Sequence, residues 1–271
     1  MKYSYMSFST PEATLRECVD LASRHGYHGI EPRIGAGHSH GIELTMSKDA
    51  RAEARATVSD AGQAISCIAT SLKFADPSAE RETFEDALRV IDLAADLSCG
   101  LVRVFGGGFP DEMSREDAIA RCVEAFHRVE PHASERKVTL AFETHDSWTD
   151  PKHVMAVVTE VDSPAVAVNW DVMHPVRVSG YSMEDAYEVL KPAIRHVHVH
   201  DGDGPGEDLK IRPMGTGYYD HKTVIKLLES DDYDGFVSGE WILSLLPDDY
   251  GYEKHLKHEI ETLKSYESHA S

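Results

Sequence analysis

The chain has 271 residues, enough for one large domain, and we predict a single domain over residues 1–271. Acidic residues outnumber basic ones by 47 to 27, and the formal net charge of −20 repels nucleic-acid phosphates and anionic lipids, so neither is an expected partner. No apolar run approaches the roughly 20 residues of a membrane helix, and the N-terminus lacks the apolar region of a signal peptide. We therefore expect a cytoplasmic protein.

Short apolar segments alternate with longer amphipathic ones along the whole chain. The strand candidates are Lys2–Ser7, His28–Pro32, Ala64–Thr70, Leu101–Phe105, Val138–Phe142, Ala165–Asn169, Ile194–Val199 and Gly235–Gly239. Eight strand and helix repeats predict an α/β fold, a single-domain (β/α)8 TIM barrel. A doubly wound dinucleotide-binding sheet is disfavoured because no GxGxxG turn follows the first strand.

Two of the predicted helices illustrate the pattern. In the segment from Thr10 to Gly26, Thr10 is the expected N-terminal cap and Gly26 the expected end. The segment from Ser78 to Leu97 carries apolar residues at three- and four-residue steps. The four cysteines are widely spaced without a CxxC pair, which favours reduced structural thiols over disulfides or a zinc cluster. Long loops, Arg33–Lys48 and Asp201–Tyr219, follow the second and seventh strands and should lie over the mouth of a barrel.

Four ionisable residues stand at or near the C-terminal ends of the last four predicted strands: Glu143, Asp171, His198 and Glu240. A barrel brings such strand ends together. A single acid at a strand end is often only a helix cap or a surface charge, but apolar residues precede each of these acids, and a charge that closes a buried strand needs a partner. Three carboxylates and an imidazole suit one divalent ion, Mn, Mg, Co or Zn. We predict that these four residues are its ligands.

Three histidines, His196, His198 and His200, alternate with valines, so on a strand they face the same side. They could be polar packing inside the barrel, but their position among the acids favours at least one metal ligand. We choose His198, with His196 deeper in the barrel and His200 nearer the loop.

The sequence resembles the xylose-isomerase-like TIM-barrel superfamily of sugar phosphate isomerases and epimerases, and within it the ketose 3-epimerases. The resemblance spans nearly the whole chain and rests on GIE, ETH, DxxH, HVHVHD, MGTGYYD and GEW segments. It implies the same four metal ligands. It also implies that His174, the histidine of DxxH, and an arginine after the metal-binding histidine contact substrate oxygens. Arg212 is the candidate for that arginine, although the segment DGDGPGEDLKI before it departs from the family pattern; the alternative is an exposed loop cation.

The resemblance implies a metal-dependent isomerase or epimerase that acts on a ketose or related sugar, with or without a phosphate group. The metal would stabilise a cis-enediolate while Glu143 and Glu240 act as the acid and base. An alternative in the same fold is a metal-dependent lyase that dehydrates a keto-inositol or sugar acid. A DNA-repair endonuclease is disfavoured by the charge, and a non-catalytic sugar-binding barrel by the intact ligand set. A homo-oligomer is compatible with the sequence, which does not specify the oligomeric state.

Other residues near the predicted strand ends have two interpretations each. Glu31 could bind substrate or form a buried ion pair. His38 and His40 could contact substrate or a second metal, or lie in a solvated loop. Arg103 with the glycines at 106–108 could bind a phosphate or carboxylate, or the glycines could simply permit a tight turn. Trp148 and Trp241 could be pocket walls or core.

Overall fold

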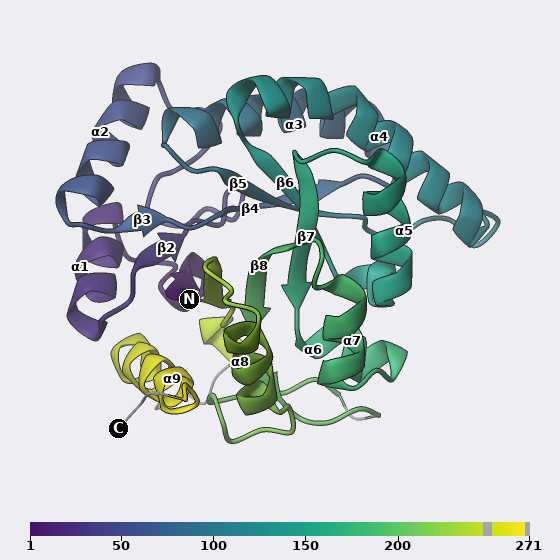
Figure 1. Ribbon diagram of the computed structural model, residues 1–271. Helices are drawn as coiled ribbons and strands as arrows, with labels where there is room; N and C mark the ends of the chain where they lie inside the picture. Colours follow the sequence, from purple (N-terminus) through teal and green to yellow (C-terminus); the bar gives the residue numbers. More distant parts are fainter. Residues whose placement is uncertain (207, 246–250, 269–271) are drawn as a thin grey trace.

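The computed structural model describes residues 1–206, 208–245 and 251–268, and its centre is a parallel sheet curled into a barrel (Figure 1). The strand order is β3-β2-β1-β11-β8-β7-β6-β5-β4. The strands of this sheet are β1 Lys2–Met6, β2 Gly29–Glu31, β3 Ala64–Ile65, β4 Ile68–Lys73, β5 Leu101–Phe105, β6 Thr139–Glu143, β7 Val166–Asp171, β8 Ile194–Val199 and β11 Phe236–Gly239. Each predicted strand is present, and the predicted barrel is confirmed.

The third predicted strand, Ala64–Thr70, was wrong as a continuous element, because it is divided into β3 and β4. The break lies where this segment changes partner, since β3 pairs with β2 whereas β4 pairs with β5. Across the gap, an isolated parallel bridge joins Arg33 to Ala69, and the Ile34 amide donates to the Ala69 carbonyl at 3.0 Å. These contacts join the segment after β2 to β4 and so close the barrel.

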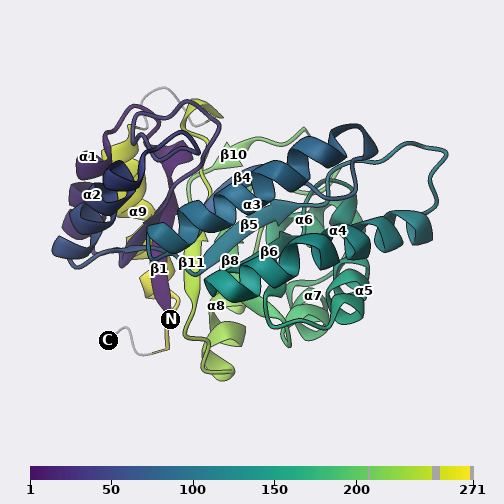
Figure 2. The ribbon, with the colours of Figure 1, turned by 90° about the horizontal axis from the view of Figure 1, so that it is seen from above.

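Helices surround the strands on the outside (Figures 1 and 2). They are α1 Leu15–His25, α2 Lys48–Asp60, α3 Glu80–Asp96, α4 Arg115–Arg136, α5 Pro151–Val161, α6 Met173–Ser179, α7 Met183–Leu190, α8 His221–Ser230 and α9 Tyr252–Ser265. The short 3₁₀ turns are η1 Ser7–Ser9, η2 Pro77–Ala79, η3 Asp146–Trp148 and η4 Leu243–Leu245. Helix α9 contacts both α1 and α8 and so completes the outer ring. Among the described residues, no helix is both long and apolar enough to cross a membrane.

Helix α1 shows how local sequence sets an element's ends. The prediction that Thr10 caps this helix was wrong, because Thr14 accepts from the Glu17 amide and Glu17 returns a bond to the Thr14 amide. This reciprocal pair satisfies amide groups that the first helical turn leaves open. Gly26 ends the helix as predicted, with a positive φ of 79°.

Strand β8 separates the barrel interior from the outer core. His196 and His198 face the interior, while the alternating Val197 and Val199 pack in the hydrophobic core under the helices. All four side chains are fully buried. The long loop after β8 contains a small antiparallel pair that the sequence did not predict, β9 Asp201–Gly202 and β10 Ile211–Arg212. The four cysteines are buried free thiols, as expected.

Candidate metal centre

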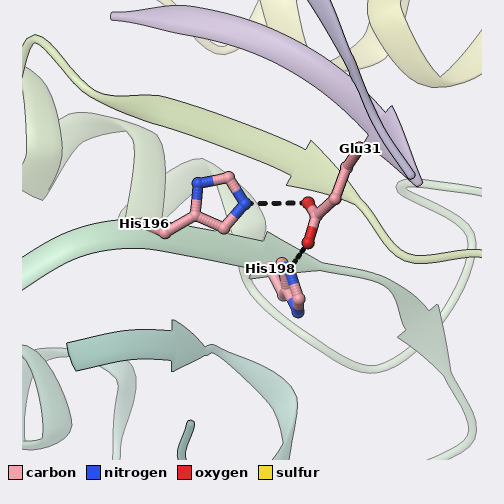
Figure 3. Close-up of side chains that lie close together, drawn as sticks. All are labelled: Glu31, His196 and His198. Carbon is pink, nitrogen blue, oxygen red and sulfur yellow. Dashed lines mark hydrogen bonds and ion pairs between the residues drawn. The ribbon is translucent and has the colours of Figure 1, made fainter. Parts of the chain in front are cut away.

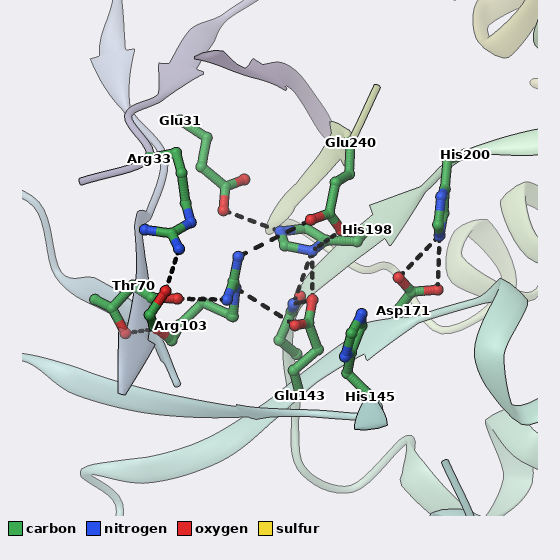
Figure 4. Close-up of polar contacts among 12 residues, drawn as sticks. Glu31, Arg33, Thr70, Arg103, Glu143, His145, Asp171, His198, His200 and Glu240 are labelled. Atoms are coloured by element: carbon green, nitrogen blue, oxygen red, sulfur yellow. Dashed lines mark hydrogen bonds and ion pairs between the residues drawn. The ribbon is translucent and has the colours of Figure 1, made fainter. Parts of the chain in front are cut away.

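The four predicted ligands meet at the C-terminal end of the barrel (Figure 4). Glu143 ends β6, Asp171 ends β7, His198 lies in β8, and Glu240 directly follows β11. These strands are neighbours in the sheet, and their register places Asp171 beside His198. One ligand atom from each residue lies within 4.8 Å of the others. Residues separated by long stretches of sequence therefore form one compact group.

His198 stands at the centre of this group. Its Nδ1 atom lies 2.6 Å from Glu143 Oε1 and 3.0 Å from Glu240 Oε2. The Asn169 amide nitrogen donates to Glu143 Oε1 at 2.6 Å and lies 3.0 Å from the same His198 nitrogen. The hydrogen-bonded imidazole and carboxylates converge on one small volume.

Two carboxylate oxygens in this group are buried and lie beside charged nitrogen groups. Oε2 of Glu143 is 3.4 Å from Arg103 Nε, and Oε2 of Glu240 is 3.0 Å from His198 Nδ1. Several carboxylates buried together need compensating positive charge, so this group suits a bound cation. Three carboxylates and one imidazole are the donor set that a divalent cation with open coordination positions prefers. The residues present thus fit a metal ion.

A third carboxylate, that of Glu31, contacts His198 through its other ring nitrogen (Figure 3). Glu31 Oε1 lies 2.9 Å from His198 Nε2, and Glu31 Oε2 lies 2.8 Å from His196 Nε2. All three side chains have no exposed surface. If Nε2 of His198 donates its hydrogen to Glu31, the lone pair of Nδ1 is left facing the acids. The buried ion-pair interpretation describes Glu31 in this structure, and direct substrate contact stays a prediction.

The charges in the centre shift the pKa values of its members. Burial opposes the charged form of His198, but Glu31, Glu240 and Glu143 together raise its pKa well above the ordinary value. Burial likewise opposes ionisation of Glu240, yet His198 and then Arg103 lower its pKa to about 2. Glu240 is therefore ionised beside an imidazole that binds a proton.

Arg103 on β5 supplies the nearest buried positive charge. Its Nε lies 3.4 Å from Glu143 Oε2, its Nη2 lies 3.9 Å from Glu240 Oε1, and its Nη1 donates to the Thr70 carbonyl at 2.6 Å. The guanidinium also stacks on the Phe105 ring, 4.0 Å from its centroid. It offsets part of the negative charge of the ligand carboxylates.

Asp171, the fourth predicted ligand, also belongs to a histidine cluster at the rim. His200 Nε2 lies 2.9 Å from Asp171 Oδ2, and His174 Nε2 lies 3.5 Å from the same oxygen. The His145 ring packs against His174 with their centroids 4.3 Å apart. Burial opposes the charged form of His145, but Asp146 and Glu143 raise its pKa to about 9. His174, whose side chain is 14 % exposed, lies at the edge of the centre where a substrate could reach it.

The remaining predicted substrate residue, Arg212, lies in β10 of the loop after β8. Its Nε donates to Asp203 Oδ1 at 2.7 Å, its Nη2 donates to Asp203 Oδ2 at 3.1 Å, and its side chain is 47 % exposed. Arg212 therefore pairs with a carboxylate of its own loop. This arrangement agrees with the alternative that Arg212 is an exposed loop cation.

The glycines at 106–108 have a packing explanation. A Cβ atom added to Gly106 would lie 2.1 Å from the Trp148 ring nitrogen, and that nitrogen donates to the Gly107 carbonyl at 3.0 Å. Trp148 and Trp241 are both fully buried. The tight-turn and core interpretations therefore describe these residues: Gly106 makes room for Trp148, and Gly107 has a positive φ of 76°.

The two histidines of the loop that follows β2 are packed against the barrel. His38 Nδ1 lies 2.8 Å from Ser7 Oγ, and His40 Nε2 lies 3.3 Å from the Arg33 carbonyl. Only 5 % of His40 is exposed. The two rings therefore help to hold the loop in place, and the solvated-loop interpretation does not describe His40.

Sequence reasoning missed Asn169 and the position of Arg33. Asn169 lies two residues before Asp171 on the same strand, so strand alternation places both side chains on one face. That period-two relation could have identified it. Arg33 offered no comparable signal, because its position depends on how the barrel closes.

Comparisons with known proteins were made for the sequence and for the fold. The comparison with curated proteins found no sequence match. Solved structures with a similar fold include the probable 3-DHS dehydratase AsbF from Bacillus anthracis, with a TM-score of 0.80 and 21% identity over 97% of this chain and 98% of that one. A D-psicose 3-epimerase crystallised with D-fructose has a TM-score of 0.79 and 17% identity over 98% and 99%.

The 3-keto-D-glucoside 4-epimerase YcjR from E. coli is similar to the same degree, with a TM-score of 0.79 and 14% identity over 98% of this chain and 99% of that one. These likenesses show a shared fold. The family model described as "Xylose isomerase-like TIM barrel" matches residues 19–266. The chain therefore belongs to the xylose isomerase-like TIM barrel family.

Proposed function

We propose that this protein is a divalent-metal-dependent isomerase or epimerase of a ketose or related sugar. The observation that carries the proposal is the meeting of Glu143, Asp171, His198 and Glu240. Their ligand atoms lie within 4.8 Å of one another, and the three carboxylates are at most 12 % exposed. The named epimerase structures with this fold support a sugar-like substrate. Mn, Mg, Co and Zn all fit the donor set.

The chemistry proposed requires removal of a weakly acidic hydrogen beside a ketone carbonyl. A bound divalent metal would supply positive charge that polarises the carbonyl oxygen. Glu143 and Glu240 are the proposed proton carriers, because they come from different strands and their carboxylates converge on the same ligand group. Return of the proton to the same carbon from the other face epimerises the sugar, and return to the adjacent carbon isomerises it.

The residues around the ligands have proposed roles in binding and orientation. His174 at the rim would donate to a substrate oxygen beside the metal, and Arg212 is retained as a second candidate for such a contact. Asn169 fixes the Glu143 carboxylate through its 2.6 Å hydrogen bond. Buried Arg103 limits the repulsion between the two glutamates.

The test is hydrogen exchange in deuterium oxide. Metal-loaded protein incubated with a panel of ketoses and cyclitols should introduce deuterium at the carbon beside the carbonyl of at least one compound. Glu240→Gln should reduce that exchange about 10²–10⁴-fold, because it removes one proton carrier. Exchange that is absent with every compound, or unchanged in Glu240→Gln, contradicts the proposal.

A metal-dependent lyase is the second candidate, because the fold is shared with a probable dehydratase at a TM-score of 0.80. Such an enzyme would use the same metal and base but expel a hydroxyl group. Mass spectrometry of the products separates the two: an isomerase conserves the substrate mass, whereas a dehydratase releases one water.

A further inference from the structure

Arg33 is a buried cation whose backbone is held in place by the closure of the barrel. Its amide donates to Ser7 Oγ at 2.9 Å, and its carbonyl is 3.3 Å from His40 Nε2. The bridge to Ala69 fixes it beside β4. Only 9 % of the residue is exposed. The position of Arg33 is therefore set by the fold rather than by its own charge.

The side chain of Arg33 has neutral partners. One terminal nitrogen donates to the Ile34 carbonyl, the other donates to Ser71 Oγ, and the guanidinium lies 5.9 Å from the centroid of the Phe8 ring. Among the described residues, no carboxylate lies within 4.0 Å of it. The nearby Glu43 carboxylate instead accepts from the Gly35 amide. A guanidinium has five N–H groups, so this one keeps donors available.

A second guanidinium lies close by. Figure 4 shows the Arg33 and Arg103 side chains reaching the same part of β4, beside Thr70. Burial and then the charge of Arg103 lower the pKa of Arg33 to about 10, which leaves it charged near neutral pH. Arg103 contacts Glu143 and Glu240 directly, whereas the charges of Glu240, Glu43 and Glu143 act on Arg33 only from a greater distance. Two buried guanidinium groups repel each other, and a bound anion would offset that repulsion.

We propose that Arg33 binds an anionic group of the substrate, a carboxylate or a phosphate, at the edge of the metal centre. An arginine fork is suited to both groups because it can donate two parallel hydrogen bonds. Ser71, already in contact with the guanidinium, would help to orient it. The inference rests on the proposed function in one respect, that the rest of the ligand is a ketose held at the metal centre.

A neighbouring pocket does not serve as an alternative anion site. It has a volume of about 470 Å³ and lies beyond Ser71, but its wall includes Glu43, Glu82 and Asp86. Those carboxylates would repel an anion. The anionic group is therefore proposed to contact the guanidinium of Arg33 itself and not the wall of this pocket.

The test is a binding comparison on the Mn²⁺-loaded protein by isothermal titration calorimetry. The probes are D-fructose, D-fructuronate and D-fructose 6-phosphate, which differ only at the sixth carbon. We expect at least one anionic ketose to bind about tenfold more tightly than D-fructose, since charged hydrogen bonds are the stronger kind. Preference for fructuronate identifies a carboxylate subsite, and preference for the 6-phosphate identifies a phosphate subsite.

Substitution of Arg33 tests whether this residue causes the tighter binding of anionic ketoses. Arg33→Met should bring the affinities for anionic and neutral ketoses to within about threefold of each other. Arg33→Gln should have the same effect although it keeps hydrogen-bonding capacity. Arg33→Lys keeps the charge and should retain part of the preference for the anionic ketose. The exposed Arg16→Met is the matched control and should keep the wild-type ratio. Thermal melting of each variant checks that the barrel is intact.

The proposal is overturned if the wild-type protein binds the anionic and neutral ketoses equally, or binds none of them, or if Arg33→Met and Arg33→Gln keep the full ratio. This outcome is distinguishable from failure of the proposed function. If the protein prefers anionic ketoses but catalyses no deuterium exchange, the anion subsite is supported and the isomerase proposal is refuted. If it catalyses exchange but binds anionic and neutral ketoses equally, the isomerase proposal is supported and the subsite is refuted.

Discussion

Glu31 and His198 form a pair in which the carboxylate Oε1 lies 2.9 Å from the imidazole Nε2. The contact spans 167 positions of sequence. It turns Nδ1 of His198 toward Glu143 and Glu240, so Glu31 orients a predicted ligand without being one of the four.

Replacement of Glu31 should weaken metal binding. Glu31→Gln removes the charge that favours the Nε2–H form of His198, and outer-shell partners of this kind are worth about 10–100-fold in metal affinity. Calorimetric titration of the metal-free variant with Mn²⁺ measures the effect. The exposed Glu12→Gln is the control. An affinity equal to that of the wild-type protein would show that Glu31 does not orient His198.

Metal binding should release protons and strengthen as the pH rises. The carboxylates around His198 raise its pKa in the metal-free protein well above 6.5, so a proton must leave before the imidazole can ligate. Titration in buffers of different ionisation enthalpy should give a heat that varies with the buffer. A buffer-independent heat near neutral pH would contradict proton release.

The same pKa shift predicts how the stability of the metal-free protein depends on pH. A group whose folded pKa is raised contributes stability that is complete below its unfolded value, about 6.5, and is lost as the pH rises through the folded value. The His198 contribution should therefore decline above about pH 6.5. Urea unfolding at several pH values, with and without metal, should show the decline only in the metal-free protein.

Loss of the Asn169 amide should impair proton transfer. Asn169→Ala removes the donor that holds Glu143 Oε1 at 2.6 Å and leaves the carboxylate less ordered. We expect the rate of substrate deuterium exchange to fall about 10–100-fold. Asn169→Asp, which keeps the shape of the side chain but removes the donor, should lower the exchange rate at least as far. A rate unchanged in Asn169→Ala would refute this positioning role.

A methyl group at position 106 should destabilise the fold. Gly106→Ala places Cβ 2.1 Å from Trp148 Nε1, and both residues are buried, so the ring must move at a cost of about 1–3 kcal/mol in unfolding free energy. Gly108→Ala is the matched control, since its added Cβ meets nothing within 4 Å. Denaturant unfolding of both variants provides the measurement, and equal stabilities would contradict the packing argument.

The barrel and the convergence of the four proposed ligands were predictable because they depend on local patterns. Alternating strand and helix segments gave all eight strands, and an acid or histidine at each late strand end gave the group of Glu143, Asp171, His198 and Glu240. Parallel strands bring their C-terminal ends together whatever the details of packing. For this reason the convergence of the four residues did not require knowledge of side-chain contacts.

Contacts between distant segments were not predictable in the same way. Whether Glu31 would meet substrate or histidine depended on how far β2 lies from β8 across the barrel, which no local pattern records. The division of the third strand and the burial of Arg33 follow from barrel closure. Thr10 was wrongly chosen as a helix cap because two threonines compete there, and Thr14 has Glu17 at the capping-box spacing.

The contact between Glu31 and His198 also links the metal centre to folding. The four proposed ligands all come from residues 143–240, in the later half of the chain, but the carboxylate that orients His198 arrives with the second strand. A fragment containing only the later half would carry every ligand and still lack the orienting group. Metal affinity is therefore a measure of whether the two halves of the chain have assembled, and metal uptake during refolding should follow barrel closure rather than precede it.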